Sequence, residues 1–354
     1  MKKVAIVGSH GLYANYGGWD QLVNNLAEKK SKGNFEYLIF NSSQSLKDFI
    51  PPPGVSIKRI ELKSSGFIGL FFDFYSILIC FFKVDVILFL GVQGMPLIPF
   101  LSMFRKCVLI SNMGGIEWER PKFGFLSKQY LKFCFWLALV YSKWVILDNE
   151  HYKTFIPNKY VYKTIVIPYG GVIDFNLEST NDLVSKFPFL TKTYFLSISR
   201  SLRDNQIEKL CESFVGLNEI LVLISNFSKS EFGKDVLNKH KFFDNIILID
   251  GLYNKQELDL IRRKCIAYIH THTLCGTAPS LVEMIVCGKP IISFDIPQNR
   301  FTLDGQGLFF SEFQVLKKIV STITEFDNYI VKGDFCNRYD WNDVVSKYEN
   351  TFFN

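Results

Sequence analysis

The chain has 354 residues, of which 48% are hydrophobic and 21% are charged. This composition provides a large core and excludes a disordered protein, and the length suits two domains of about 170 residues each. Residues 1–170 hold 20 Lys and Arg against 11 Asp and Glu, whereas residues 171–354 hold 20 against 23. A basic first half favours an anionic lipid or a phosphorylated ligand, and the absence of zinc-finger, RNP or arginine-rich motifs argues against nucleic acid.

The cysteines and the N-terminal residues both indicate a cytoplasmic chain. Eight cysteines are scattered without a CxxC pair or a ligand-like spacing, which is typical of reduced, mostly buried thiols and argues against a structural zinc. The apolar stretch before Gly8 is too short for the core of a secretory signal. We expect it to form the first strand instead.

Short apolar runs alternate with helical patterns along the chain. The opening run 2–7 predicts a buried strand, and a glycine-rich loop and an amphipathic helix near 19–30 follow it. Later runs in the first half are EYLIF, VDVILFL, KCVLIS, KWVILD and TIVIP. This alternation predicts a mainly parallel sheet covered on both faces.

The pattern restarts after the sequence Pro168-Tyr169-Gly170-Gly171. The second series consists of TYFLSIS, ILVLIS, NIILID, CIAYIHT and KPIISFD. We therefore predict an α/β protein with two Rossmann-like, doubly wound domains, at 1–170 and 171–339, with the linker inside 168–190. Residues 340–354 are expected to form a helix that packs back on the first domain.

Two segments of the first half are unusually apolar. Residues 66–82 carry Asp73 in their middle and are short for a bilayer crossing; both a sheet-covering helix and a membrane contact stay open for them. Residues 125–144 interleave Lys128, Lys132 and Lys143 with aromatic residues. That composition favours a helix lying in a membrane interface.

The first loop places Gly8, Gly11, Gly17 and Gly18 between a strand and a helix. Glycines at such a position let the backbone approach an anion, and the helix N-terminus supplies N–H groups. The dinucleotide fingerprint G-x-G-x-x-G is absent, which disfavours a Rossmann oxidoreductase. An anion site and a tight turn without a ligand both remain open.

The most informative segment is HTHTLCGTAPSLVEMIVCGKPII in the second half. The pattern predicts a loop at 276–279, a helix that begins at Ser280 and ends at Cys287-Gly288, and Glu283 in the first turn of that helix. Backbone N–H groups at a helix start suit a diphosphate. A carboxylate such as Glu283 suits the two hydroxyls of a ribose, although a helix-stabilising role is the alternative.

These segments resemble glycosyltransferase family 4, and most closely its bacterial surface-polysaccharide branch that includes β-1,4-rhamnosyltransferases. The resemblance extends over nearly the whole chain and rests on VAIVGSHGLYANYGGWDQ, NMGGIEWERPKFG, ILDNE, IPYGG, SISRSLRDNQIE, YIHTHTLCGTAPSLVEMIVCGKPII and DIPQNR. It implies the GT-B fold, with two domains facing a cleft, a donor site mainly on the second domain and an acceptor site mainly on the first.

The resemblance assigns donor-side roles. Arg200 matches the arginine that binds the donor diphosphate, and Glu283 matches the ribose binder, so these two are the catalytic candidates. Asn205 stands where many members carry lysine, and Cys275 replaces a partner glutamate. The remaining donor-binding candidates are Gly17, Gly18, Asn205, His270, Gly276, Thr277, Pro279, Ser280 and Leu281. His270 and His272 alternate along a predicted strand and so are expected to face the same way.

The acceptor-side candidates are Glu117, Arg120, Asp148 and Asn149. Glu117 and Arg120 lie in the segment NMGGIEWERPKFG, in which Gly114 stands where the branch usually has an acid. A salt-bridged loop without a ligand is the alternative for this pair. Asp148 and Asn149 end a predicted strand, where open α/β sheets bind ligands.

The resemblance implies a retaining transfer of rhamnose, or otherwise galactose or glucose, from a nucleotide diphosphate sugar. The acceptor is expected to be a polyprenyl-diphosphate-linked glycan of O-antigen, capsule or exopolysaccharide synthesis, at anionic lipids of the inner face of the bacterial plasma membrane. No DxD motif is present, so we expect no cofactor and no required metal. A nucleotide-sugar 2-epimerase and a non-catalytic nucleotide-sugar-binding scaffold are the alternatives.

Overall fold

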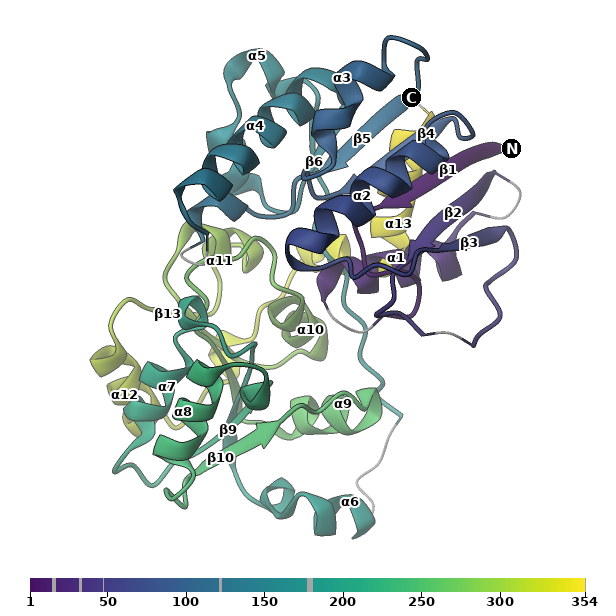
Figure 1. Cartoon of the computed structure of the whole chain (residues 1–354). Helices are drawn as coiled ribbons and strands as arrows, with labels where there is room; N and C mark the ends of the chain where they lie inside the picture. The colour runs from purple at the N-terminus through teal and green to yellow at the C-terminus, as the bar shows by residue number, and fades with distance from the viewer. Residues whose placement is uncertain (15–16, 32–33, 47, 121–122, 177–180, 354) are drawn as a thin grey trace. The chain divides into compact units, whose positions relative to one another are not determined.

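Two compact units make up the chain (Figure 1). The computed structural model describes all residues except 15–16, 32–33, 47, 121–122, 177–180, 354 and the side chain of Asn181. Unit 1 comprises Met1–Gly170 with Arg338–Asn354, and unit 2 comprises Gly171–Asn337. Each unit is built on a parallel sheet with helices on its faces, as the alternation of apolar runs predicted.

The sheet of unit 1 has the strand order β3-β2-β1-β4-β5-β6-β7, and each neighbouring pair is parallel. Its central strands are apolar on both sides because helices cover both faces. The strands are β1 (Lys2–Val7), β2 (Phe35–Asn41), β3 (Val55–Arg59), β4 (Val86–Leu90), β5 (Val108–Asn112), β6 (Trp144–Leu147) and β7 (Thr164–Val166).

Helices α2, α3 and α4 contribute to the core on one face of this sheet, and α1 and α13 to the core on the other. The α-helices of unit 1 are α1 (Gly18–Lys29), α2 (Gly66–Cys80), α3 (Ile98–Leu101), α4 (Phe125–Tyr141), α5 (Asn158–Val161) and α13 (Trp341–Phe353). Short 3-10 turns lie at Met95–Leu97, Glu117–Glu119, Glu150–Phe155 and Asp334–Tyr339.

The C-terminal helix α13 packs on the first unit, which confirms the prediction. The Phe352 ring meets the Phe35 ring edge to face, with centroids 5.4 Å apart. The Tyr348 hydroxyl lies 2.5 Å from Asn112 Nδ2, and the Glu349 carboxylate accepts hydrogen bonds from Ser31. Aromatic packing and these polar contacts therefore fix the helix against unit 1.

Unit 2 repeats this architecture with the strand order β10-β9-β8-β11-β12-β13, again all parallel. Its strands are β8 (Tyr194–Ile198), β9 (Ile220–Ser225), β10 (Ile246–Asp250), β11 (Ala267–His270), β12 (Ile291–Phe294) and β13 (Leu308–Phe310). The α-helices are α6 (Asn181–Lys186), α7 (Ile207–Phe214), α8 (Glu231–His240), α9 (Lys255–Lys264), α10 (Pro279–Cys287), α11 (Pro297–Thr302) and α12 (Phe313–Thr322). Shorter 3-10 turns lie at Pro188–Thr191, Arg203–Asn205, Phe227–Lys229 and Asp327–Tyr329.

Among the described residues, no helix combines the length and the apolar character that a membrane crossing requires.

Candidate functional site

The candidate donor site begins where the strand order of unit 2 reverses. Strands β8 and β11 are neighbours in the sheet although they are far apart in sequence. The carboxyl ends of two such strands form the position at which open α/β sheets bind ligands. Arg200 follows β8 and is exposed, and the segment 271–280 follows β11. The fold therefore brings the two strongest donor-side segments to one edge.

Hydrogen bonds tie these two loops together. Asn205 Nδ2 donates to the Arg200 carbonyl at 2.7 Å, and Thr271 Oγ1 donates to the Asn205 carbonyl at 2.5 Å. Thr273 Oγ1 donates to the Asp204 carbonyl at 2.8 Å. Asn205 is buried, so its amide group holds the backbone that carries Arg200. Sequence patterns did not single out Thr271 or Thr273, because their partners lie about 66 residues away.

Helix α10 starts one residue earlier than predicted. Pro279 is its first residue, and Gly288 ends it in the left-handed conformation with φ 67°. Glu283 is consequently its fifth residue and lies beyond the first turn, which corrects the prediction. Proline is favoured at this first position because its missing N–H would be unpaired there anyway.

The donor-binding candidates around the start of α10 differ in what they offer a ligand. Gly276 and Thr277 are buried, and the Ser280 side chain hydrogen-bonds Tyr268. The Leu281 side chain is fully buried, and its backbone N–H donates to the Ala278 carbonyl. Leu281 thus serves the helix itself, and Pro279 has no N–H to donate.

Glu283 belongs to a buried ion network. Its Oε2 accepts a hydrogen bond from Arg262 Nη2, and Arg262 Nη1 donates to Asp259 Oδ1 at 2.8 Å. Arg262 and Asp259 are both buried, and Lys255 pairs with the second Asp259 oxygen. Burial raises the pKa of Glu283, and the Arg262 guanidinium opposes that rise. Among the described residues, Oε1 of Glu283 has no hydrogen-bond partner, so this oxygen is the one available to a ligand.

His270 ends β11, and His272 lies just beyond the strand. Their rings nevertheless lie together, with centroids 4.2 Å apart. Burial lowers the pKa of the His270 imidazole to about 3, so this ring is neutral at physiological pH. A neutral ring can accept or donate a hydrogen bond but offers no charge to a diphosphate.

The glycine-rich loop of unit 1 is closely packed at its start, at Gly8 and Gly11. Gly8 has φ 97°, and a Cβ at this position would lie 2.1 Å from the Leu90 carbonyl oxygen, so the loop requires glycine there. Gly17 and Gly18 cap and begin α1. The buried carboxylate of Asp20 already sits in the first turn of α1 and accepts a hydrogen bond from the His10 N–H. An acidic group therefore occupies the helix end that was a candidate for anion binding.

Trp19 packs against two glycines of unit 1. A Cβ at Gly91 would lie 3.0 Å from its ring, and a Cβ at Gly114 would lie 2.9 Å from it. Gly114 also has φ 59°. Glycine therefore fits at position 114, because the indole ring of Trp19 fills the space that a side chain would need.

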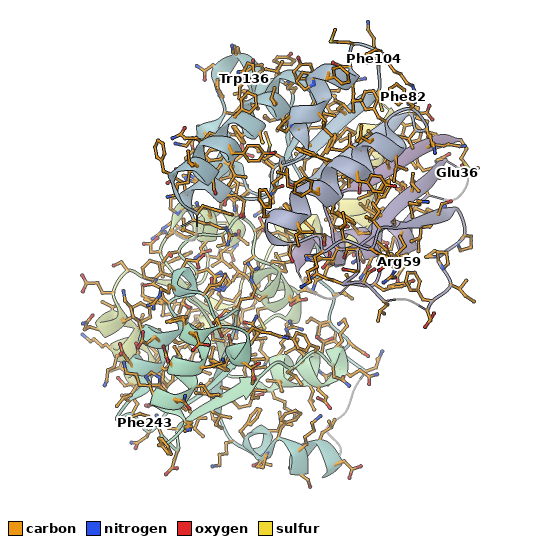
Figure 2. The ribbon with its side chains drawn as sticks, viewed as in Figure 1. Glu36, Arg59, Phe82, Phe104, Trp136 and Phe243 are labelled. Atoms are coloured by element: carbon orange, nitrogen blue, oxygen red, sulfur yellow. The ribbon has the colours of Figure 1, made fainter. Side chains whose placement is uncertain are left out.

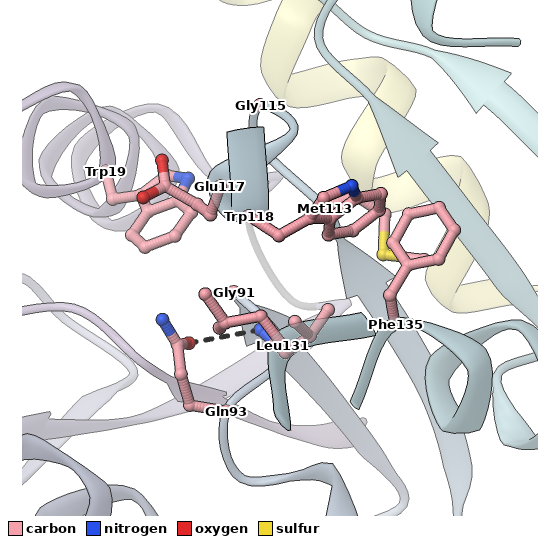
Figure 3. Close-up of a pocket in the computed structure, with 10 residues that line it drawn as sticks. Trp19, Gly91, Gln93, Met113, Gly115, Glu117, Trp118, Leu131 and Phe135 are labelled. Atoms are coloured by element: carbon pink, nitrogen blue, oxygen red, sulfur yellow. Dashed lines mark hydrogen bonds between the residues drawn. The ribbon is translucent and has the colours of Figure 1, made fainter. Parts of the chain in front are cut away.

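The same indole ring lines a small hollow in unit 1 (Figure 3). Gln93, Glu117, Trp118 and Phe135 also line it. The rings of Trp118 and Phe135 meet edge to face with centroids 4.7 Å apart, and Gln93 Oε1 accepts a hydrogen bond from the Val92 N–H.

The acceptor-side candidates lie around the carboxyl ends of β5 and β6. Arg120 Nε pairs with Glu117 Oε1 at 2.8 Å. This ion pair is the one expected if the two residues form a salt-bridged loop. Asp148 and Asn149 directly follow β6 and are buried. Asn149 caps the turn at Glu150–Phe155 through its side chain, which accepts from the His151 N–H.

Comparisons of sequence give no match to a protein-family model and none to a curated protein. Comparison with solved structures does give matches. A sucrose-phosphate synthase from Thermosynechococcus elongatus matches with a TM-score of 0.78 and 12% identity over 100% of this chain and 98% of its own. HepE from Anabaena, solved with UDP-glucose, matches with a TM-score of 0.74 and 14% identity over 100% of both chains.

Trehalose-6-phosphate synthase OtsA also matches, with a TM-score of 0.72 and 9% identity over 100% of this chain and 99% of its own. The chain has the GT-B fold. In a GT-B chain both units are Rossmann-like, and the order of strands in each sheet agrees with that description.

Proposed function

We propose that this GT-B chain is a retaining glycosyltransferase that uses a nucleotide diphosphate sugar. The observation that carries the proposal is the edge of unit 2 at which two loops are tied to one another. One follows β8 and carries Arg200, and the other follows β11 and leads into α10. A cation and a helix N-terminus on adjacent loops suit a departing diphosphate. The complex of HepE with UDP-glucose supports a nucleotide sugar as the ligand class.

Each donor-side group has a separate task in this proposal. Arg200 and the backbone around Gly276 and Thr277 bind the diphosphate and stabilise the charge that develops as the glycosidic bond breaks. Oε1 of Glu283 accepts hydrogen bonds from the ribose hydroxyls, while Arg262 holds Oε2 in place. These groups require no divalent metal at the diphosphate.

The sugar is transferred with retention, by attack of the acceptor hydroxyl on the face from which the phosphate departs. The leaving phosphate oxygen takes the proton of the acceptor, so no side chain needs to act as the base, and attack on this face needs no covalent nucleophile. Resemblance to the rhamnosyltransferase branch favours deoxythymidine-diphosphate rhamnose, and the HepE complex favours a uridine diphosphate hexose.

Calorimetric titration with a panel of nucleotide diphosphates and nucleotide sugars tests the donor site. We expect selective binding of one nucleotide sugar and its loss, by at least about tenfold in affinity, in Arg200→Ala and in Glu283→Ala. Lys209→Ala, on the exposed side of α7 (Ile207–Phe214), serves as the control cation and is expected to bind as the parent chain does. Folded protein that binds no nucleotide would reject the assignment.

The acceptor in this proposal is a polyprenyl-diphosphate-linked glycan, because unit 1 exposes an aromatic face. We define the aromatic face as the exposed apolar side chains of α2, α3, α4 and the residues that follow α2 and α3: Phe67, Ile68, Phe71, Tyr75, Leu78, Phe82, Phe100, Met103, Phe104, Phe125, Leu126, Phe133, Trp136, Val140 and Tyr141. Figure 2 shows Phe82, Phe104 and Trp136 in the upper part of the view, on unit 1. Exposed apolar side chains gathered on the helices that cover one face of a sheet are typical of a surface that contacts a partner or a membrane.

Charge favours an anionic membrane as that partner. Within residues 66–82 the one acidic residue, Asp73, is buried, and 125–144 contain no acid. Lys83, Lys106, Lys132 and Lys143 are exposed at or next to the aromatic face. Apolar side chains flanked by lysines are the composition of a reversible contact with anionic lipid. The protein would accordingly work at the inner face of the bacterial plasma membrane.

Co-sedimentation with phosphatidylglycerol vesicles tests the aromatic face. We expect the double variant Phe67→Glu, Phe71→Glu to lose at least about tenfold in partitioning, because two exposed rings no longer enter the lipid. Phe242→Glu is the matched control, since Phe242 is 80% exposed but belongs to unit 2. Equal losses in both variants, or no partitioning of the parent chain, would contradict the membrane contact.

A further inference from the structure

His270, His272 and Cys275 form a cluster at the carboxyl end of β11. One ligand atom from each residue lies within 4.8 Å of the others. The spacing H-x-H-x-x-C lies outside the patterns expected of structural zinc sites, so no ion was expected here from sequence. The cluster forms because β11 ends at His270 and the chain turns back on itself before α10.

His270 supplies an independent indication that something binds at this cluster. The side chain is 1% exposed, and neither of its ring nitrogens has a hydrogen-bond partner among the described residues. A buried polar atom without a partner costs about 1–3 kcal/mol, so native proteins rarely retain two on one ring. A metal ion accepts an electron pair from an imidazole nitrogen. Such an ion would remove this cost for the His270 nitrogen that faces the cluster.

The types of ligand atom select the class of ion. Two imidazole nitrogens and a thiolate suit Zn²⁺ and related borderline-soft ions, whereas Mg²⁺ and Ca²⁺ prefer oxygen ligands. We propose that His270, His272 and Cys275 bind one Zn²⁺-like divalent cation through three protein ligands. A fourth coordination position then stays open for water or another ligand, because tetrahedral Zn²⁺ takes four.

Asn299 holds two of the three ligands in place. It is fully buried, and its Nδ2 donates to the His272 carbonyl at 3.3 Å and to the Phe294 carbonyl at 2.9 Å. Its Oδ1 accepts a hydrogen bond from Cys275 Sγ at 3.4 Å. Ion binding would replace the bond from Cys275 to Asn299, because the thiol proton is released to solvent and the thiolate coordinates the ion.

The proposed cation is bound by protein side chains, so it differs from a metal that bridges a donor diphosphate. It also departs from our expectation, based on the absence of a DxD motif, that the chain requires no metal. Cys275 directly precedes Gly276, so a bound ion would fix the backbone that leads into α10. The proposal does not depend on the proposed function, because the cluster and its test need no nucleotide.

The test uses the full chain, purified without a histidine tag and stripped with a chelator. Zn²⁺ is titrated against a chromophoric chelator, and Co²⁺ is added separately as a spectroscopic probe. We expect one ion per chain, a thiolate-to-cobalt charge-transfer band, and an affinity at least about tenfold lower in Cys275→Ser and His272→Gln. Cys336→Ser, a half-buried thiol elsewhere in unit 2, is the control that keeps the full affinity.

Three outcomes would overturn the proposal: no ion bound by the folded chain, binding that survives both substitutions, or bound Co²⁺ without a thiolate band. The stripped protein is also titrated with nucleotide sugars. Nucleotide binding without ion binding overturns the metal site alone, and ion binding without nucleotide binding overturns the donor site alone.

Discussion

Arg262→Met is expected to destabilise unit 2 by about 3–5 kcal/mol. The substitution removes a buried guanidinium that pairs with both Asp259 and Glu283. Asp259 keeps Lys255 and the Asp174 N–H, but Glu283 loses its charged partner. Hydrogen exchange of the amides in α9 and α10 measures the loss directly, because it reports opening of these helices separately from unit 1.

Two further variants separate charge from packing at this position. Adding Glu283→Gln to Arg262→Met removes the unpaired carboxylate, so the double variant is expected to lose less stability than the sum of the single variants. Lys264→Met, at an exposed position of the same helix, is expected to change stability by less than about 0.5 kcal/mol. A similar small change in Arg262→Met would show that the ion network does not stabilise the unit.

Asp73→Asn is expected to stabilise unit 1 above neutral pH and to flatten its dependence on pH. Asp73 is buried in α2, and burial raises the pKa of its carboxyl to about 7. Between the ordinary pKa and the raised one, the folded state holds a proton that the unfolded state releases. Stability therefore falls by about 1.4 kcal/mol per pH unit as pH rises through this window, and levels off above it.

Unfolding of unit 1 in urea between pH 4 and pH 8 measures this effect. The parent chain is expected to lose up to about 4 kcal/mol through Asp73 over that range, and Asp73→Asn to escape this loss. Asp85→Asn changes an exposed carboxyl of the same unit and should keep the slope of the parent chain. Parallel pH profiles for the parent and Asp73→Asn would show that Asp73 ionises as a solvated acid does.

Most of the fold could be predicted from the sequence, because runs of apolar residues mark the buried strands and helix faces. The buried strands at the centre of each sheet, the helix α1 and the helix α13 were all expected from such runs. Strands β3 (Val55–Arg59) and β13 (Leu308–Phe310) were not, because VSIKR alternates with polar residues and LFF has only three residues, so local patterns carry little signal. The other two edge strands, β7 and β10, were expected because their runs TIVIP and NIILID are apolar.

The candidate site was predictable only where a local motif marks it. The loop before α10 was singled out because a strand, a loop and a helix follow one another in sequence. Arg200 was singled out by its match to the family arginine, and the donor-side role of both stays a prediction. The contact of Arg262 with Glu283 was not, since it joins two residues that lie 21 positions apart on different helices. The fit of Trp19 against Gly91 and Gly114 likewise depends on the packing of three segments, which no local pattern encodes.

The most direct test of the central claim is transfer itself. The purified chain is incubated with nucleotide sugars labelled in the sugar, with and without a lipid extract that contains polyprenyl-diphosphate-linked glycans. We expect release of nucleoside diphosphate that depends on the extract, with the label in the lipid fraction and the anomeric configuration of the donor retained. Labelled sugar that is epimerised without transfer, or a bound nucleotide sugar that stays intact with a competent acceptor, would contradict the account.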